Sequence, residues 1–262
     1  MQESSPTPLQ SQHCAGRHPG GVLGGADEHV RRLHPAATAP ENEDGVEGED
    51  QHRCANHESE RVPVAEMPEL ERYVLHLLAD MDAKLRQAVD DFDFNTYVRC
   101  LSDFANNDLS AFFFDIRKDS LYCDAPTSPK RRAYRTVLDT LFHALVRYAA
   151  PVLVFTAEEV WAMRFPDAES VHLVEWPEVE AGWVNFDLAD RWNELKAVRA
   201  IAFAAAERAR ADKTIRSTLE AKINVILTNE ALRMLVLDHF DVHHGLVSEI
   251  FISSAVNILK AD

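Results

Sequence analysis

Two stretches of the chain carry a local excess of positive charge. Between residues 117 and 147, seven basic residues stand against three acidic ones, and between residues 196 and 222 the count is again seven against three. Each stretch therefore has a net charge of +4. Lys and Arg gathered in this way neutralise phosphates, which is the electrostatic signature of nucleic-acid binding. The alternative is that these side chains simply line solvated faces of helices.

Other kinds of chemistry lack the residues that they need. Seven of the nine glycines fall before residue 61, so the later sequence has no glycine-rich loop that would cradle a phosphate. No Gly-x-Ser-x-Gly motif occurs, and the carboxylates stand at spacings typical of solvated helix faces. The four cysteines lie far apart with no Cys-x-x-Cys pair. We therefore expect no catalytic residue, no metal site and no cofactor in this chain.

The basic stretches must be positioned by helices. Apolar residues recur every three or four positions over residues 68–89, which predicts one amphipathic helix that ends at the acidic residues 90–93. The same pattern predicts a long helix from Phe94 to about Tyr122 and a third that begins near Ser128. Pro151 predicts a break near Ala150, because proline removes a backbone donor. A shorter helix then runs to residue 164, beginning at Pro151 or after a cap at Thr156.

The second half of the chain changes its pattern twice. Residues 166–186 read as a connection, in which Val171, Leu173 and Trp176 alternate as in an extended run. A fourth long helix is predicted from Leu188 to about Lys213. Alternating apolar residues then predict a strand over 219–227, a helix over 230–239 and a second strand over 247–252. The fold class is therefore mainly α, with a small β-α-β appendage.

Composition separates residues 1–60 from the rest of the chain. The 262 residues carry a net charge of −16, and 46 % of them are apolar, but no Phe, Tyr or Trp occurs before residue 61. We expect that segment to be a disordered or non-native tail, since it offers too few apolar side chains to offset the entropy of ordering. No secretory signal and no apolar run long enough for a membrane span is present. These features favour a soluble, cytoplasmic protein without a membrane partner.

Four blocks of sequence, in order, resemble the anticodon-binding region of bacterial isoleucyl-tRNA synthetases, which are class I enzymes. The first covers residues 94–124, and the second, APVLVFTAEEVW at 150–161, is similar to the pattern A-P-h-h-x-F-T-A-[DE]-E-V-W, where h is apolar. The third is VHLVEWP at 171–177. The fourth, KTIRSTLEA at 213–221, resembles K-x-I-G-x-S-L-E-A, with Arg216 in place of the glycine. The resemblance runs from about residue 61 to the end of the chain.

The resemblance implies a domain plan and a partner. It implies an anticodon-binding helical bundle over 61–165, a connection over 166–186, and a long helix with a small α/β appendage over 187–262 that stops before the family's zinc knuckle. The family ligates isoleucine to tRNA with ATP. The signatures of its catalytic domain are not found in this sequence, so we expect this chain alone to be inactive and its partner to be isoleucine tRNA.

Combined with the charge pattern, the resemblance selects candidate residues for contacts with tRNA phosphates. Phe112, Phe114 and Trp161 offer rings that would stack on bases, but their helical spacing favours core packing. The candidate tRNA-binding residues are Arg117, Lys118, Lys130, Arg131, Arg132, Arg135, Lys213 and Arg216.

Two alternatives stay open. In the first, the chain is a tRNA-binding module. In the second, it does not bind RNA and is a helical interaction module or a decayed gene fragment. In a further version of the first reading, a separately encoded catalytic chain completes the enzyme.

Overall fold

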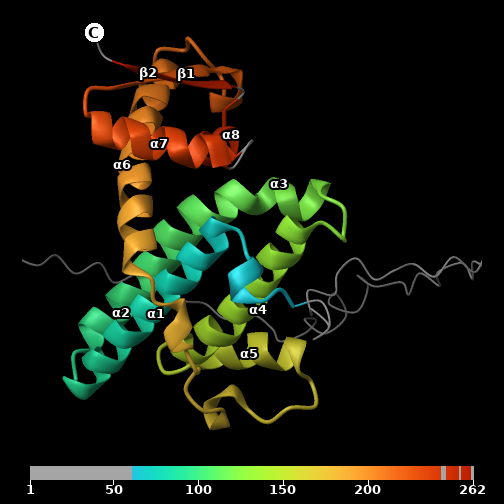
Figure 1. The fold of residues 1–262 in the computed structure, drawn as a ribbon. Helices are drawn as coiled ribbons and strands as arrows, with labels where there is room; N and C mark the ends of the chain where they lie inside the picture. The colour runs from blue at the N-terminus through green and yellow to red at the C-terminus, as the bar shows by residue number, and fades with distance from the viewer. Residues whose placement is uncertain (1–60, 243–245, 254, 261–262) are drawn as a thin grey trace, which may run out of the picture. The chain divides into compact units, whose positions relative to one another are not determined.

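A computed structural model describes residues 61–242, 246–253 and 255–260 (Figure 1). The predicted disordered or non-native tail, residues 1–60, lies outside the described residues. The described part is mainly helical and ends in a small two-stranded sheet, so the predicted fold class is confirmed. No helix in this part is both long enough and apolar enough to cross a lipid bilayer.

Helix α1 (Glu69–Asp90) lies at the centre of the helical bundle. Most of its apolar stripe is buried, with Leu70, Leu78 and Leu85 at 0 % exposure, and it packs against α2, α4 and α6. The helix ends at the acidic segment, as predicted, and the chain turns through Phe92 at a positive φ of 58°. A left-handed residue commonly terminates a helix because it redirects the backbone.

The second helical run has no break within it. It consists of α2 (Phe94–Asp103), a π-helical stretch η3 (Phe104–Phe114) and α3 (Asp115–Cys123). Asp93 caps the run, since its Oδ1 accepts a hydrogen bond from the backbone N of Thr96 at 3.0 Å. The predicted long helix over 94–122 is therefore confirmed, and the π-helical geometry within it is an addition that the pattern does not reveal.

The next two helices are α4 (Pro129–Ala149) and α5 (Val154–Arg164). Pro129 occupies the first turn of α4, where the missing N–H costs nothing. The break predicted at Pro151 is confirmed, but α5 begins at Val154, so neither Pro151 nor Thr156 is its first residue. Val146, Ala157, Trp161 and other residues form a separate apolar cluster where α4 and α5 meet.

The connection to α6 folds into 3-10 turns and not into an extended run. These turns are η4 (Val171–Leu173) and η5 (Ala181–Trp183). Glu158 of α5 causes the difference, because its Oε2 accepts hydrogen bonds from the Ser170 hydroxyl at 2.8 Å and the Val171 N at 3.0 Å. These bonds curl the chain against α5 and override the alternating pattern.

Helix α6 (Phe186–Ala211) belongs to two parts of the molecule. Its first half packs in the bundle, where the fully buried ring of Trp192 stacks on Tyr73 with 5.4 Å between ring centroids. Its second half leaves the bundle and runs to the strands (Figure 1). Asn185 caps the helix by accepting a hydrogen bond from the Leu188 N at 2.9 Å. The fourth predicted helix is confirmed.

The C-terminal α/β unit comprises residues 218–242, 246–253 and 255–260. It contains η6 (Thr218–Glu220), β1 (Lys222–Leu227), α7 (Glu230–Val242), α8 (Leu246–Phe251) and β2 (Ala255–Lys260). The two strands are parallel, with Lys222 opposite Ala255, and the helices supply the crossover that parallel strands require.

The predicted second strand over 247–252 is wrong, because that segment is α8. The second strand is β2, which comes later in the chain. Ile250 and Phe251 of α8 are 4 % and 3 % exposed, so packing against the bundle decides this short segment and not its weak alternation.

The surroundings of His76 predict that acid lowers the stability of the bundle. Its Nδ1 accepts a hydrogen bond from the Asn185 N at 3.0 Å, and burial lowers the pKa of the imidazole, an effect that the Asp80 carboxylate partly opposes. The unfolded state then binds a proton that the folded state resists, below the usual histidine pKa of about 6.5. We expect the free energy of unfolding to fall as pH drops from about 7.5 to about 5.5, and urea titrations of the wild type and His76→Gln to show a smaller fall in the variant. Equal falls in both proteins would contradict this assignment.

Candidate nucleic-acid interface

The eight candidate cations lie in two places in the fold. The α3–α4 group sits on α3 and the first two turns of α4, and the α6-end group follows the last turn of α6. The α3–α4 group is Arg117, Lys118, Lys130, Arg131, Arg132 and Arg135. The α6-end group is Lys213 and Arg216.

Arg117 does not belong to the surface. Only 1 % of the residue is exposed, and its Nε and Nη2 donate to the two carboxylate oxygens of Glu71 at 2.7 and 2.9 Å. Its Nη1 donates to Glu249 of α8 at 2.7 Å. A buried guanidinium with two carboxylate partners is not available to a phosphate, so the structure removes Arg117 from the candidate contacts.

Lys118 and Lys130 reach solvent but already have carboxylate partners. The Lys118 side chain is 50 % exposed and its Nζ donates to Asp115 at 2.8 Å. The Lys130 side chain is 33 % exposed and its Nζ donates to Glu249 at 2.6 Å. Exposed ion pairs contribute little to stability, so the Lys118 ammonium can exchange its carboxylate for a phosphate at small cost.

The cations of α4 sit where a helix ordinarily disfavours them. Lys130, Arg131 and Arg132 occupy its first turn, which contains no acidic residue, although the positive end of the helix dipole is found there. Arg131 is half-buried, and its Nη1 donates to the Asp124 carbonyl at 2.7 Å. Arg132 and Arg135 are half-buried as well. The helix dipole therefore does not account for this cluster.

The α6-end group is exposed and lies around one hollow of about 680 Å³. Lys213 has a positive φ of 59°, and the N–H groups of Lys213 and Thr214 bind the carbonyls of Arg210 and Ala209 at 3.0 and 2.9 Å. These two bonds form a Schellman motif, which usually places glycine in the left-handed position. A lysine there brings a cation to the negative end of the helix, where the dipole also stabilises it.

Two findings extend the prediction at this end of α6. Arg210 lines the same hollow as Lys213 and Arg216, so the structure adds a third cation to the two selected from the sequence. The sequence could have indicated Arg210, because it lies inside the second basic stretch, residues 196–222. Arg216 has no positive φ, and its N–H donates to Glu220 at 3.1 Å, so a side chain is tolerated where the family pattern has glycine.

The family model described as "Anticodon-binding domain of tRNA ligase" matches residues 71–226, which is more than half of the chain. The chain belongs to this family. The matched region includes the bundle, α6 and β1, and thus both groups of cations in this anticodon-binding domain.

Similar proteins in bacteria carry the name isoleucine–tRNA ligase. The chain is 53 % identical over 209 residues to that of Zymomonas mobilis, which covers 78 % of this chain and 22 % of the relative. It is 46 % identical over 199 residues to that of Mesorhizobium japonicum, with 76 % and 20 % covered. The relative in Agrobacterium fabrum is 45 % identical over 205 residues, with 78 % and 21 % covered. The chain therefore spans about a fifth of the length of these relatives.

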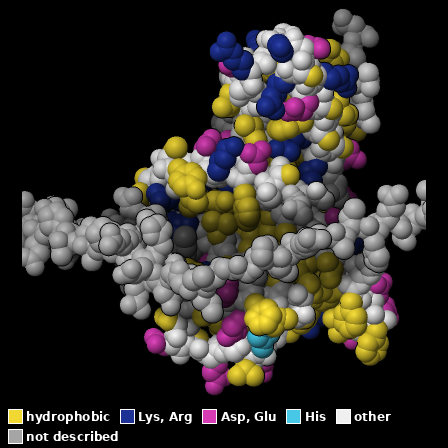
Figure 2. Space-filling view, turned by 180° about the vertical axis from the view of Figure 1, so that it is seen from behind, with side chains coloured by type: hydrophobic (Ala, Val, Ile, Leu, Met, Phe, Trp, Pro, Cys, Tyr) yellow, Lys and Arg dark blue, Asp and Glu magenta, His cyan; other side chains and the backbone are white. Residues whose placement is uncertain are grey.

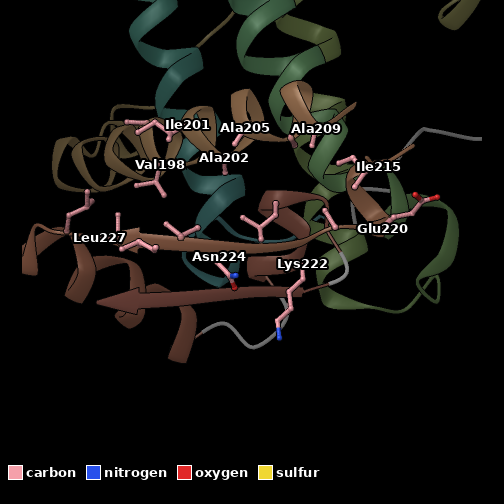
Figure 3. Close-up of a pocket in the computed structure, with 17 residues that line it drawn as sticks. Val198, Ile201, Ala202, Ala205, Ala209, Ile215, Glu220, Lys222, Asn224 and Leu227 are labelled. Carbon is pink, nitrogen blue, oxygen red and sulfur yellow. The ribbon is translucent and has the colours of Figure 1, made fainter. Parts of the chain in front are cut away.

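Basic and acidic side chains are distributed unevenly over the face shown in Figure 2. On the face shown in Figure 2, Lys and Arg side chains gather over the C-terminal α/β unit, and Asp and Glu are more frequent at the opposite end. A groove of about 600 Å³ between α6 and β1 is lined mainly by aliphatic side chains, with Glu220 and Lys222 as its charged residues (Figure 3). This apolar groove does not suit a phosphate backbone, so it is not part of the candidate interface.

The aromatic candidates belong mainly to the core of the domain. Phe112 and Trp161 are 2 % and 7 % exposed, which confirms that packing, and not base stacking, accounts for their spacing. Phe114 is half-buried against the core. Across the described ranges, no three or more His, Cys, Asp or Glu side chains come together as a metal site would require.

Proposed function

We propose that this chain binds the anticodon stem-loop of a tRNA, and specifically of isoleucine tRNA. The observation that carries the proposal is the family match over residues 71–226, because that range contains the whole set of surface cations in both groups. The choice of isoleucine tRNA rests on the name that the three relatives share.

The chemistry of the interface supports phosphate recognition more strongly than base recognition. Apart from the buried Arg117, the Lys and Arg of both groups can donate charge-assisted hydrogen bonds to phosphate oxygens, and each phosphate that is neutralised releases counterions. Sequence-specific reading of RNA uses unstacked loop bases, which the anticodon provides. With a net charge of −16 on the chain, long-range attraction is weak, so binding depends on these local groups.

A salt titration of binding to the isolated anticodon stem-loop tests the proposal. We expect affinity to fall linearly on a log–log plot, with a slope of about −0.7 to −0.9 for each phosphate neutralised. Lys213→Ala and Arg216→Ala should each make that slope shallower by about 1 and weaken binding to all sequences equally. Fluorescence anisotropy at several salt concentrations measures both quantities.

The matched control for these variants is Lys84→Ala. Lys84 is an exposed lysine of α1 outside both groups, and it pairs with Asp80 at 2.6 Å. Its removal changes the net charge by the same amount, so we expect an unchanged slope. An anticodon-mutated stem-loop should bind more weakly than the native one. Absence of binding at low salt would contradict the proposed function.

The activity of the whole ligase is a separate proposal. Isoleucine ligation needs ATP and a catalytic domain, and we assign neither ATP nor any other cofactor to the residues described here. We propose that such activity, where it occurs, depends on a separately encoded catalytic chain and takes place in the cytoplasm, with tRNA as shared substrate. Mixing the two chains should then restore ATP-dependent aminoacylation that neither shows alone.

A second candidate function, protein interaction, is favoured by the outer face of α5. Phe155 and Met163 are 84 % and 87 % exposed, and Leu173 of η4 is 71 % exposed. Large apolar side chains that are exposed to solvent can mark contact with another protein when they form a patch. If this is the function, Phe155→Ser should abolish co-purification of a partner while leaving binding to the stem-loop unchanged.

A further inference from the structure

Helix α8 is held by cations from three helices of the molecule. The Glu249 carboxylate receives hydrogen bonds from Arg117 of α3 at 2.7 Å and from Lys130 of α4 at 2.6 Å. The next carbonyl, that of Ile250, accepts a bond from the Nε of Arg199 of α6 at 2.8 Å. Among the described residues, the end of α8 is therefore a place where hydrogen bonds join the C-terminal α/β unit to the bundle.

Because Arg117 is buried, losing its hydrogen bond to Glu249 would cost more than losing an exposed contact. Arg117 is 1 % exposed, and Glu71 occupies its Nε and Nη2, so the Nη1 depends on Glu249. A buried donor without a partner is costly, whereas an exposed one returns to water. Arg199 reinforces the joint, since its guanidinium donates to a carbonyl at the C-terminal end of α8.

We propose that Glu249 is a positioning residue for RNA binding. It fixes the C-terminal α/β unit on the bundle. Because the Arg216 N–H donates to Glu220 of that unit at 3.1 Å, this also fixes the α6-end group relative to the α3–α4 group, so that both contact one RNA molecule. The inference rests on the proposed function, and it assigns a favourable role in RNA binding to a negatively charged side chain.

Glu249 would act in this way because two weak binding sites held at a fixed spacing bind RNA with higher affinity than either site alone. Once one group of cations holds the RNA, the second contact is intramolecular, and its contribution depends on how closely the geometry is kept. The whole of α5 and α6 lies between the two groups of cations in the sequence. The distance between the groups is therefore set by tertiary contacts and not by a short linker. A loosened joint lets each group bind but removes the advantage of binding together.

The test compares two carboxylate-to-amide variants. Simple electrostatics predicts that either removal tightens RNA binding, because a negative charge near the RNA is lost. For Glu207→Gln, a 60 % exposed carboxylate on α6, we expect unchanged or up to about threefold tighter binding. For Glu249→Gln we expect binding to be weaker by about fivefold or more. A thermal melt of both variants confirms that they remain folded at the assay temperature.

A second measurement separates positioning from general destabilisation. In the wild type, Lys213→Ala should weaken stem-loop binding by about three- to fivefold, and in the Glu249→Gln background by less than about twofold. A loss of folded protein alone would scale both affinities and leave the effect of Lys213→Ala unchanged. That result, or binding by Glu249→Gln as tight as wild type, would overturn the inference and leave the proposed function standing.

If the wild type does not bind the stem-loop at all, a distance measurement still tests whether Glu249 holds the C-terminal α/β unit in place. That outcome refutes the proposed function and, with it, a role for Glu249 in RNA binding. Spin labels at Lys84→Cys of α1 and Met234→Cys of α7, in a background without other cysteines, report the joint itself. Wild type should give one narrow distance distribution, and Glu249→Gln a broader one. Identical distributions would also refute the positioning role.

Discussion

Replacing Arg117 with methionine is expected to lower the free energy of unfolding by about 3–5 kcal/mol, because it leaves a buried carboxylate without its partner. Glu71 is 0 % exposed, and both of its oxygens accept hydrogen bonds from Arg117. Urea titration of the wild type and Arg117→Met gives the difference directly, provided the slope against denaturant is unchanged.

Two comparisons make the prediction specific. Lys118→Met removes the same charge from the next residue, but its side chain is 50 % exposed, so we expect a change within about 0.5 kcal/mol. The double variant Glu71→Leu with Arg117→Met replaces the ion pair by apolar groups, and it should recover most of the lost stability. A loss below about 1 kcal/mol for Arg117→Met alone would show that the pair is not the anchor that its burial indicates.

The misassignment of Arg117 illustrates what charge counting in a sequence can and cannot reveal. Arg117 and Lys118 are adjacent and look equivalent, yet α3 points one inward and the other outward. The partner that accounts for the burial, Glu71, lies 46 residues earlier on another helix. A count of basic residues finds the stretch that carries the cations, but tertiary contacts decide which of them face solvent.

The helices show the same division between local and tertiary causes. The long ones are predictable because apolar stripes recur over several turns, as in α1 and α6. The π-helical geometry of η3 is not predictable, since its three consecutive phenylalanines at 112–114 hide the period. The six-residue helix α8 cannot be predicted from the sequence either. So short a segment takes the structure that its packing against α3 and α6 favours.

Replacing Trp192 with alanine is expected to lower the free energy of unfolding by about 3–5 kcal/mol, through lost burial and a residual cavity. Its side chain is 0 % exposed, stacks on Tyr73 and meets Phe112 edge to face with 6.0 Å between centroids. Phe186→Ala on the same helix is the control, since Phe186 is 70 % exposed and we expect it to cost about 1 kcal/mol or less. Equal losses in the two variants would contradict the assignment of Trp192 to the core.

The same substitution connects stability to the proposed function. Trp192 fastens the first half of α6 to the bundle, and the other end of that helix carries Lys213. Below its melting temperature, Trp192→Ala should therefore weaken binding to the anticodon stem-loop even though Trp192 is not among the candidate RNA-binding residues. Trp192→Phe, which retains a ring between Tyr73 and Phe112, should preserve most of the affinity. If the alanine variant binds as tightly as wild type while folded, then α6 does not depend on this contact to hold Lys213 in place.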